Sequence, residues 1–101
     1  MRVIVFFDLP SVTASERREY SKFRRKLIKS GFLMMQESVY TKIALNQNVA
    51  ATICGEIKKI KPSSGTVQIL VITEKQFSKI ETIVGNAKSD VIDSDERVII
   101  L

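Results

Sequence analysis

The pattern of apolar and polar positions divides the chain into alternating strands and helices. The first run, Val3–Phe7, is apolar at every position and leads into Asp8 and Pro10. It predicts a strand from Arg2 to Asp8 that is covered on both faces, because a strand with one wet face shows alternation. A second continuous apolar run predicts another buried strand from Thr66 to Thr73.

The segment after Pro10 has the spacing of an amphipathic helix. Thr13 and Glu16 form a capping box, which satisfies free amides at a helix start, and Gly31 is a typical stop. We therefore expect a helix from Thr13 to about Ser30. Its apolar stripe consists of Tyr20, Phe23 and Leu27.

The middle of the chain predicts a strand pair and a second helix. Two strand-like runs, Phe32–Met35 and Val39–Ile43, are separated by three residues that form either a tight turn or a bulge. Asn46 or Asn48 then caps a second helix, and Thr73 opens a further short helical turn with a second capping box. The apolar face of the second helix consists of Val49, Ile53, Ile57 and Ile60.

The element order β-α-β-β-α-β is that of the ferredoxin-like α+β fold, and we expect one domain over residues 1–101. A polar stretch from Gly85 to Glu96 precedes a last apolar strand, Arg97–Leu101, which pairs at a sheet edge or with a partner subunit. Two helices cover only one face of such a sheet, whereas the first and fourth strands are apolar on both. The sequence therefore predicts a homodimer that covers the second face.

Composition narrows the chemistry that the chain can perform. It has no histidine, which excludes Ser-His-Asp and Cys-His catalysis as well as histidine-ligated zinc. Hydrolysis, if present, then depends on carboxylates and a hard metal ion. The longest apolar run is too short for a bilayer span, and a lone cysteine, Cys54, fits a reducing cytoplasm.

The first predicted helix concentrates basic residues on one side. Its outward stripe contains no acid, and Arg17 and Arg24 lie on a flank. Such a stripe is most often only a solvated surface, but its one-sidedness and its arginines favour phosphate binding. The net charge of +5 agrees with an anionic partner. The outward stripe consists of Arg18, Lys22, Arg25 and Lys29.

Several segments in this order resemble one family over essentially the whole chain. They are Phe6–Pro10, Glu16–Tyr20, Phe23–Arg25, Gly31–Phe32, Ser38–Tyr40 and Thr73–Phe77. The family is the small CRISPR-associated subunit of the spacer-acquisition complex, known as CRISPR-associated endoribonuclease two. The resemblance implies a cytoplasmic ferredoxin-like homodimer that holds double-stranded DNA for the CRISPR integrase subunit. It also implies that Arg17, Arg18 and their neighbours contact phosphates.

The same resemblance implies a metal site at Asp8, whose counterparts face each other across the dimer axis. One Mg²⁺ or Mn²⁺ ion would be shared by the two carboxylates, and Asp8 would be the catalytic residue of a metal-dependent endonuclease that cleaves RNA or double-stranded DNA. By itself, an aspartate before a proline is equally typical of a turn cap. The other acids show no clustering with Asp8 along the sequence.

Two further hypotheses remain open from the residues alone. A ferredoxin-like regulatory or small-ligand module has the same strand order, although the glycine-rich ligand loop that would favour it is absent. An RNA-recognition sheet with exposed aromatic residues also shares this order, but its signature aromatic motif is missing. We expect the aromatic side chains to belong to the core instead: Tyr20, Phe23, Phe32, Tyr40 and Phe77.

Overall fold

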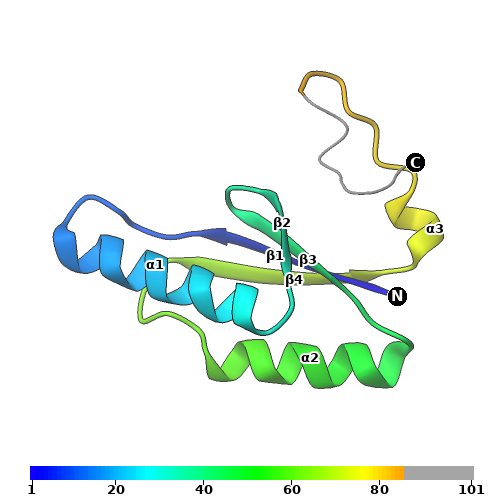
Figure 1. The fold of residues 1–101 in the computed structure, drawn as a ribbon, viewed down its shortest axis with the longest axis horizontal. Helices are drawn as coiled ribbons and strands as arrows, with labels where there is room; N and C mark the ends of the chain where they lie inside the picture. Colours follow the sequence, from blue (N-terminus) through cyan, green and yellow to red (C-terminus); the bar gives the residue numbers. More distant parts are fainter. Residues whose placement is uncertain (86–101) are drawn as a thin grey trace.

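The computed structural model describes residues 1–85, which form a four-stranded sheet with two long helices on one face (Figure 1). The strands are β1 (Arg2–Asp8), β2 (Leu33–Gln36), β3 (Val39–Ile43) and β4 (Thr66–Ile72). The helices are α1 (Ala14–Lys29), α2 (Gln47–Lys59) and the short α3 (Glu74–Phe77). The expected ferredoxin-like α+β fold is confirmed. The predicted strand Arg97–Leu101 lies outside the described residues.

The sheet has the order β2-β3-β1-β4, and every neighbouring pair is antiparallel. β2 and β3 form a hairpin, and both features left open by the sequence are present: a turn at Glu37–Ser38 and a register shift between Met34 and Gln36. Among the strands of residues 1–85, β4 lies at an edge, and its inward side chains stay partly exposed there, in contrast to the fully buried strand that we expected.

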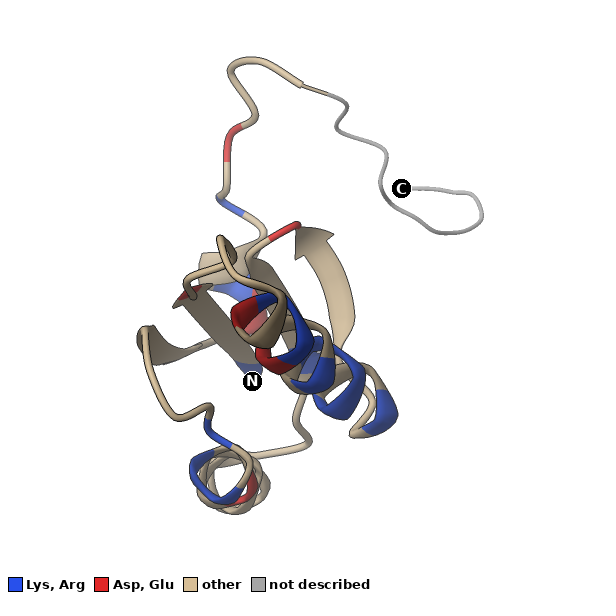
Figure 2. Ribbon diagram, turned by 90° about the vertical axis from the view of Figure 1, so that its left-hand side faces the viewer, with Lys and Arg blue, Asp and Glu red and all other residues tan. Residues whose placement is uncertain are grey.

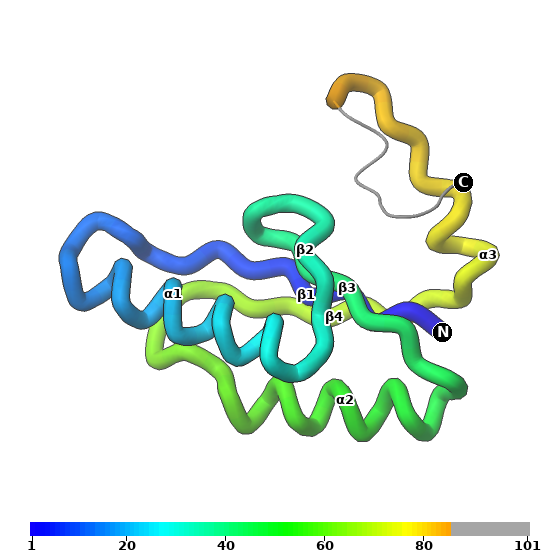
Figure 3. Tube along the Cα trace, viewed as in Figure 1, coloured from blue at the N-terminus to red at the C-terminus, as the bar shows by residue number. Residues whose placement is uncertain are grey.

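The core lies between the sheet and the two helices. Val3, Val5 and Phe7 point from β1 toward Phe23 and Leu27 of α1, and Phe7 packs edge-on against Phe23 with ring centroids 5.3 Å apart. The chain trace in Figure 3 shows α1 and α2 running in opposite directions along this face. Burial on this scale, at roughly 25 cal/mol per Å² of apolar surface, holds the helices to the sheet.

Helix α2 buries Ala50, Ile53 and Ile57, whereas Val49 is 38% exposed at the margin of its apolar face. Asn46 is the N-cap, since its side chain accepts a hydrogen bond from the amide of Val49. Cys54 is half-buried beside this face and packs against the core.

Phe77 was expected in the core but lies at the end of the sheet instead. Its ring is stacked beneath the Arg2 guanidinium, 4.0 Å from the ring centroid. Arg2 also makes a bidentate ion pair with Glu74, at 2.7 and 2.9 Å. The two contacts fasten α3 to the start of β1. The capping box of Thr73 and Gln76 stabilises the helical turn of α3 itself.

Within residues 1–85, the opposite face of the sheet carries no long helix, and its exposed large side chains are apolar. Antiparallel partners share a face, so Ile4 and Phe6 lie there with their neighbours across the ladder. Four large side chains of this face are open to solvent, to between 37% and 71%. They are Phe6, Leu33, Ile43 and Leu70. This helix-free face is the surface that the sequence predicts to be covered by a second copy.

Candidate functional site

Asp8 is the last residue of β1, and its side chain is exposed. It projects on the helix-free face, two residues beyond Phe6 and directly opposite Thr66 of β4. The strand is held on both sides up to this point, because the amide of Phe7 donates a hydrogen bond to the carbonyl of Ser38, at 3.0 Å. The carboxylate is therefore presented from a fixed backbone at the edge of solvent.

The backbone around Asp8 is held by a close approach of the β4 loop. Gly65 adopts a φ of +92°, a conformation that L side chains rarely adopt. A Cβ at Gly65 would lie 2.8 Å from the carbonyl oxygen of Asp8 and 2.7 Å from a methyl carbon of Leu9. The loop before β4 thus ends in a glycine whose conformation and surroundings exclude a side chain.

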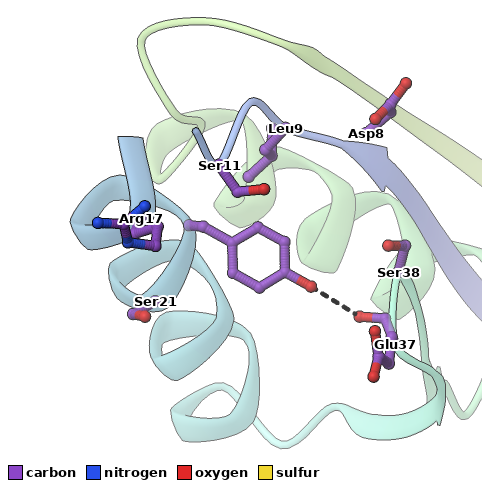
Figure 4. Close-up of a pocket in the computed structure, with 8 residues that line it drawn as sticks. Asp8, Leu9, Ser11, Arg17, Ser21, Glu37 and Ser38 are labelled. Carbon is purple, nitrogen blue, oxygen red and sulfur yellow. Dashed lines mark hydrogen bonds between the residues drawn. The ribbon is translucent and has the colours of Figure 1, made fainter. Parts of the chain in front are cut away.

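A hollow of about 520 Å³ opens beside Asp8, between the start of α1 and the β2–β3 turn (Figure 4). The Tyr20 hydroxyl closes its floor by donating to the carbonyl oxygen of Glu37, at 3.3 Å. Figure 4 shows the Asp8 carboxylate directed away from Arg17, so the acid and the cation are separate features. The hollow is lined by Asp8, Leu9, Ser11, Arg17, Tyr20, Ser21, Glu37 and Ser38.

Within residues 1–85, no three acidic or cysteine side chains gather closely enough to hold a metal ion. Among these described residues, Asp8 therefore supplies a single carboxylate at the end of β1. Magnesium is commonly bound by one or two carboxylates with water as the remaining ligands, so a pair of Asp8 side chains is a suitable donor set. Of the acids considered from the sequence, Asp90, Asp93 and Asp95 lie outside the described residues.

Helix α1 carries the basic side chains, and its start is built as predicted. The Thr13 hydroxyl accepts from the amide of Glu16, and the Glu16 carboxylate accepts from the amides of Val12 and Thr13, each at 3.0 Å. These backbone hydrogen bonds, that of Thr13 foremost, hold the pKa of Glu16 below its usual range. The carboxylate is thus committed to the cap and does not neutralise the neighbouring bases.

The helix holds seven basic residues against two acids, a surplus equal to the net charge of +5 of the whole chain. Figure 2 shows the blue positions following its outer side from end to end. All five residues that were predicted to bind nucleic acid are exposed on α1, and four of them surround one shallow groove. The four are Arg17, Arg18, Lys22 and Arg25, and Lys29 follows one turn later.

Within the described part of the chain, the ion pair formed is that between Arg2 and Glu74. None of the five α1 cations therefore has a carboxylate partner there. The structure brings Asp8 and Arg17 to one hollow, but Arg18, Lys22 and their stripe lie away from Asp8. The acid site and the basic stripe are two distinct features of the surface.

Sequence reasoning gave Arg24 no role, and the structure gives it a specific contact. Its Nε donates to the hydroxyl of Tyr40, at 2.6 Å, and this hydrogen bond is the main cause that raises the pKa of Arg24. The heptad spacing from Arg17 was the available signal that both lie on one flank of the helix. The acceptor on β3 could not be read from that spacing.

Comparison with known proteins gives consistent matches. The protein-family model described as CRISPR associated protein Cas2 matches residues 1–80. A protein named CRISPR-associated endoribonuclease Cas2 from Treponema denticola is 50% identical over 101 residues, covering all of both chains. A protein of the same name from Ligilactobacillus salivarius is 44% identical, again over the full length of both.

A solved structure agrees with the fold. The crystal structure of Streptococcus pyogenes Cas2 at pH 6.5 superposes with a TM-score of 0.62, at 15% sequence identity. The match covers 83% of this chain and all of that one. Separately, none of the helices within residues 1–85 has the length and apolar character of a membrane span.

Proposed function

The chain belongs to the CRISPR-associated Cas2 family, and from this premise we propose that it is a DNA-holding subunit of spacer acquisition. In this role a homodimer binds double-stranded DNA and presents it to the CRISPR integrase subunit in the cytoplasm. The observation that carries the proposal is the outward stripe of α1. Its arginine and lysine side chains are exposed and have no carboxylate partner among residues 1–85.

Exposed arginine and lysine side chains on a helix suit the phosphates of a duplex. Each phosphate that they neutralise releases a condensed counterion, so the affinity falls steeply with salt. Such contacts position the duplex without reading its sequence, which is what a protein that handles arbitrary new spacers requires. Basic side chains without a carboxylate partner gain most from this exchange, because no internal ion pair has to be broken before they bind a phosphate.

The homodimer is supported by the helix-free face. Leu33, Ile43 and Leu70 expose 71%, 62% and 48% of their surface there, around the central pair of Ile4 and Phe6. An apolar patch of this kind on one side of a sheet marks an interaction surface, and a second copy supplies a complementary one. Association through this face leaves both α1 helices outside and accessible to DNA.

A second activity, metal-dependent endonuclease cleavage of RNA or double-stranded DNA, is favoured by Asp8. The relatives from Treponema denticola and Ligilactobacillus salivarius carry the word endoribonuclease in their names. Asp8 lies on the same sheet face as Phe6, so association through that face brings the two protomers' carboxylates toward the interface.

Magnesium or manganese fits such a carboxylate pair, and when bound it supplies the Lewis acidity that phosphodiester hydrolysis needs. One ion would be shared between the two protomers. The backbone of Asp8 is fixed within the sheet, and its exposed carboxylate presents oxygen donors for the ion. With no histidine in the chain, proton transfer to the leaving oxygen falls to water, so we expect slow cleavage that is favoured at alkaline pH.

The test is integration of a duplex by the purified integrase with three variants of this protein. Replacing Arg18 and Arg25 together by glutamine should abolish duplex retention and integration, while Asp8→Ala should integrate normally and lose any metal-dependent cleavage. The matched control replaces Lys58 and Lys59, which are exposed on α2, and should behave like the wild type. Loss of integration in Asp8→Ala with an intact dimer would overturn the scaffold role as the primary one.

A further inference from the structure

Helix α1 has a second line of cations, on the flank that turns toward the β2–β3 hairpin. Arg24 is exposed, yet its Nε is fixed by the hydroxyl of Tyr40, 2.6 Å away. Tyr40 itself is 0% exposed and its ring packs against Phe7, with centroids 5.6 Å apart. A side chain at the surface is thus oriented by an acceptor that core packing holds still.

The acceptor is a phenol, so the hydrogen bond orients the guanidinium without neutralising it. Within the described residues Arg24 makes no further hydrogen bond and no ion pair. A guanidinium has five N–H donors, and the four on its terminal nitrogens remain for a ligand. The field of one acid, Glu37, adds a minor contribution to the raised pKa of Arg24, after those of Tyr40 and Tyr20.

Arg17 is oriented in the same manner. One of its terminal nitrogens donates to the carbonyl oxygen of Val12, at 2.6 Å, again a neutral acceptor. Arg17 and Arg24 are seven residues apart, which places them on one flank about 10.5 Å apart along the helix axis. The outward stripe differs, because none of its side chains is held by a hydrogen bond to the described residues.

We infer that Arg24 binds a backbone phosphate of duplex DNA, and that Tyr40 is its positioning residue. The inference rests on the proposed DNA-holding function and extends its contact surface from the outward stripe to the flank of α1. A planar fork that is already oriented presents two parallel N–H donors to a phosphate and loses less freedom on binding than a mobile side chain. Arg17 and Arg24 would then contact separate phosphates along the duplex.

The test is the salt dependence of duplex binding, measured for the full chain and its variants by fluorescence anisotropy. Arg24→Gln should reduce the slope of log K against log salt by about 0.9 for each lost phosphate contact, which is about 1.8 for a homodimer that uses both of its Arg24 side chains. Tyr40→Phe keeps the charge, so its slope should equal that of the wild type while its affinity falls about two- to tenfold. Lys59→Gln on α2 is the matched control and should change neither quantity.

The two residues should also be coupled. Tyr40→Phe in the Arg24→Gln background should cause no further loss of affinity, because the hydroxyl acts through Arg24. Glu37→Gln removes the nearby acid and should strengthen binding. A slope that stays at the wild-type value in folded Arg24→Gln would show that Arg24 has only a structural role and does not bind a phosphate. This result would overturn the inference.

Arg24→Lys keeps the proposal testable if glutamine at this position prevents folding. It retains the charge and loses the oriented fork, so the slope should be unchanged and the affinity reduced as in Tyr40→Phe. Wild-type affinity in Arg24→Lys would also overturn the inference. The absence of salt-dependent duplex binding in the wild-type protein is a different outcome, and it would refute the proposed DNA-holding function itself.

Discussion

Gly65 lies against the carbonyl oxygen of Asp8, close enough that a Cβ at position 65 would approach it to 2.8 Å. The contact joins the loop before β4 to the end of β1 at the candidate acid site. Since Gly65 also has a φ of +92°, both its conformation and its surroundings exclude a side chain. The geometry of Asp8 is therefore fixed from the neighbouring strand as much as from its own.

Gly65→Ala should destabilise the fold by about 1–3 kcal/mol, through backbone strain and displacement of Asp8. Urea denaturation followed by circular dichroism measures the change in the free energy of unfolding. Gly55→Ala is the matched control, since a Cβ there would meet no atom within 4 Å. In the interior of α2 that replacement should stabilise by about 0.5–1 kcal/mol, and equal losses in the two variants would contradict the argument.

Leu70→Lys should prevent self-association without unfolding the protomer, because it places a charge on the apolar helix-free face, where Leu70 of β4 is exposed. Sedimentation equilibrium gives the dissociation constant. Ile28→Lys is the control: Ile28 is 49% exposed and Leu70 is 48% exposed, but Ile28 lies on α1 in the other layer. If both variants dissociate equally, or neither does, association does not use the helix-free face.

Glu16→Gln should remove a pH dependence of stability. The folded-state pKa of Glu16 is lowered, so its contribution is complete above the ordinary value of 4.5 and is lost as the pH falls through the lowered pKa. Glutamine keeps the capping geometry and removes the charge. The wild type should be more stable at neutral pH, and the two unfolding free energies should converge in acid; a constant difference would contradict this.

Glu74→Gln should loosen α3 by breaking the bidentate ion pair with Arg2. Glu74 is 47% exposed, so the cost is about 0.2–1 kcal/mol, and it falls on α3 rather than on the core. Amide hydrogen exchange of Phe77 and Ser78, whose amides donate to the carbonyls of Thr73 and Glu74, should accelerate. Unchanged exchange there would show that the Arg2–Phe77 contact alone is sufficient.

Local signals in the sequence predicted the architecture well, but they did not predict the contacts between distant segments. The capping boxes of Thr13 and Thr73 join residues three apart, so the chain itself displays them. The continuous apolar runs likewise predicted the strands, and the helical spacing of apolar side chains predicted the helices, because both patterns depend on which faces are buried.

Contacts created by the fold could not be read in this way. The Arg2–Glu74 pair spans 72 residues and the Arg24–Tyr40 hydrogen bond spans 16, and each depends on where the sheet sets its strands side by side. The same reason explains Phe77, whose apolar character predicted burial in the core although a cation from β1 covers it. For the candidate site, the sequence indicated both Asp8 and the basic stripe of α1, but it did not show that these two features lie apart on the surface.

Helix α1, with seven basic residues against two acids, concentrates positive charge in the helix layer of the described structure. In the field of a polyanion such a molecule rotates as it diffuses, and it arrives with the α1 layer foremost. The helix-free face then points back toward solvent at the moment of capture. In the proposed DNA-holding role, a duplex would therefore be captured on one layer while a second copy associates on the other, and neither event would have to wait for the other.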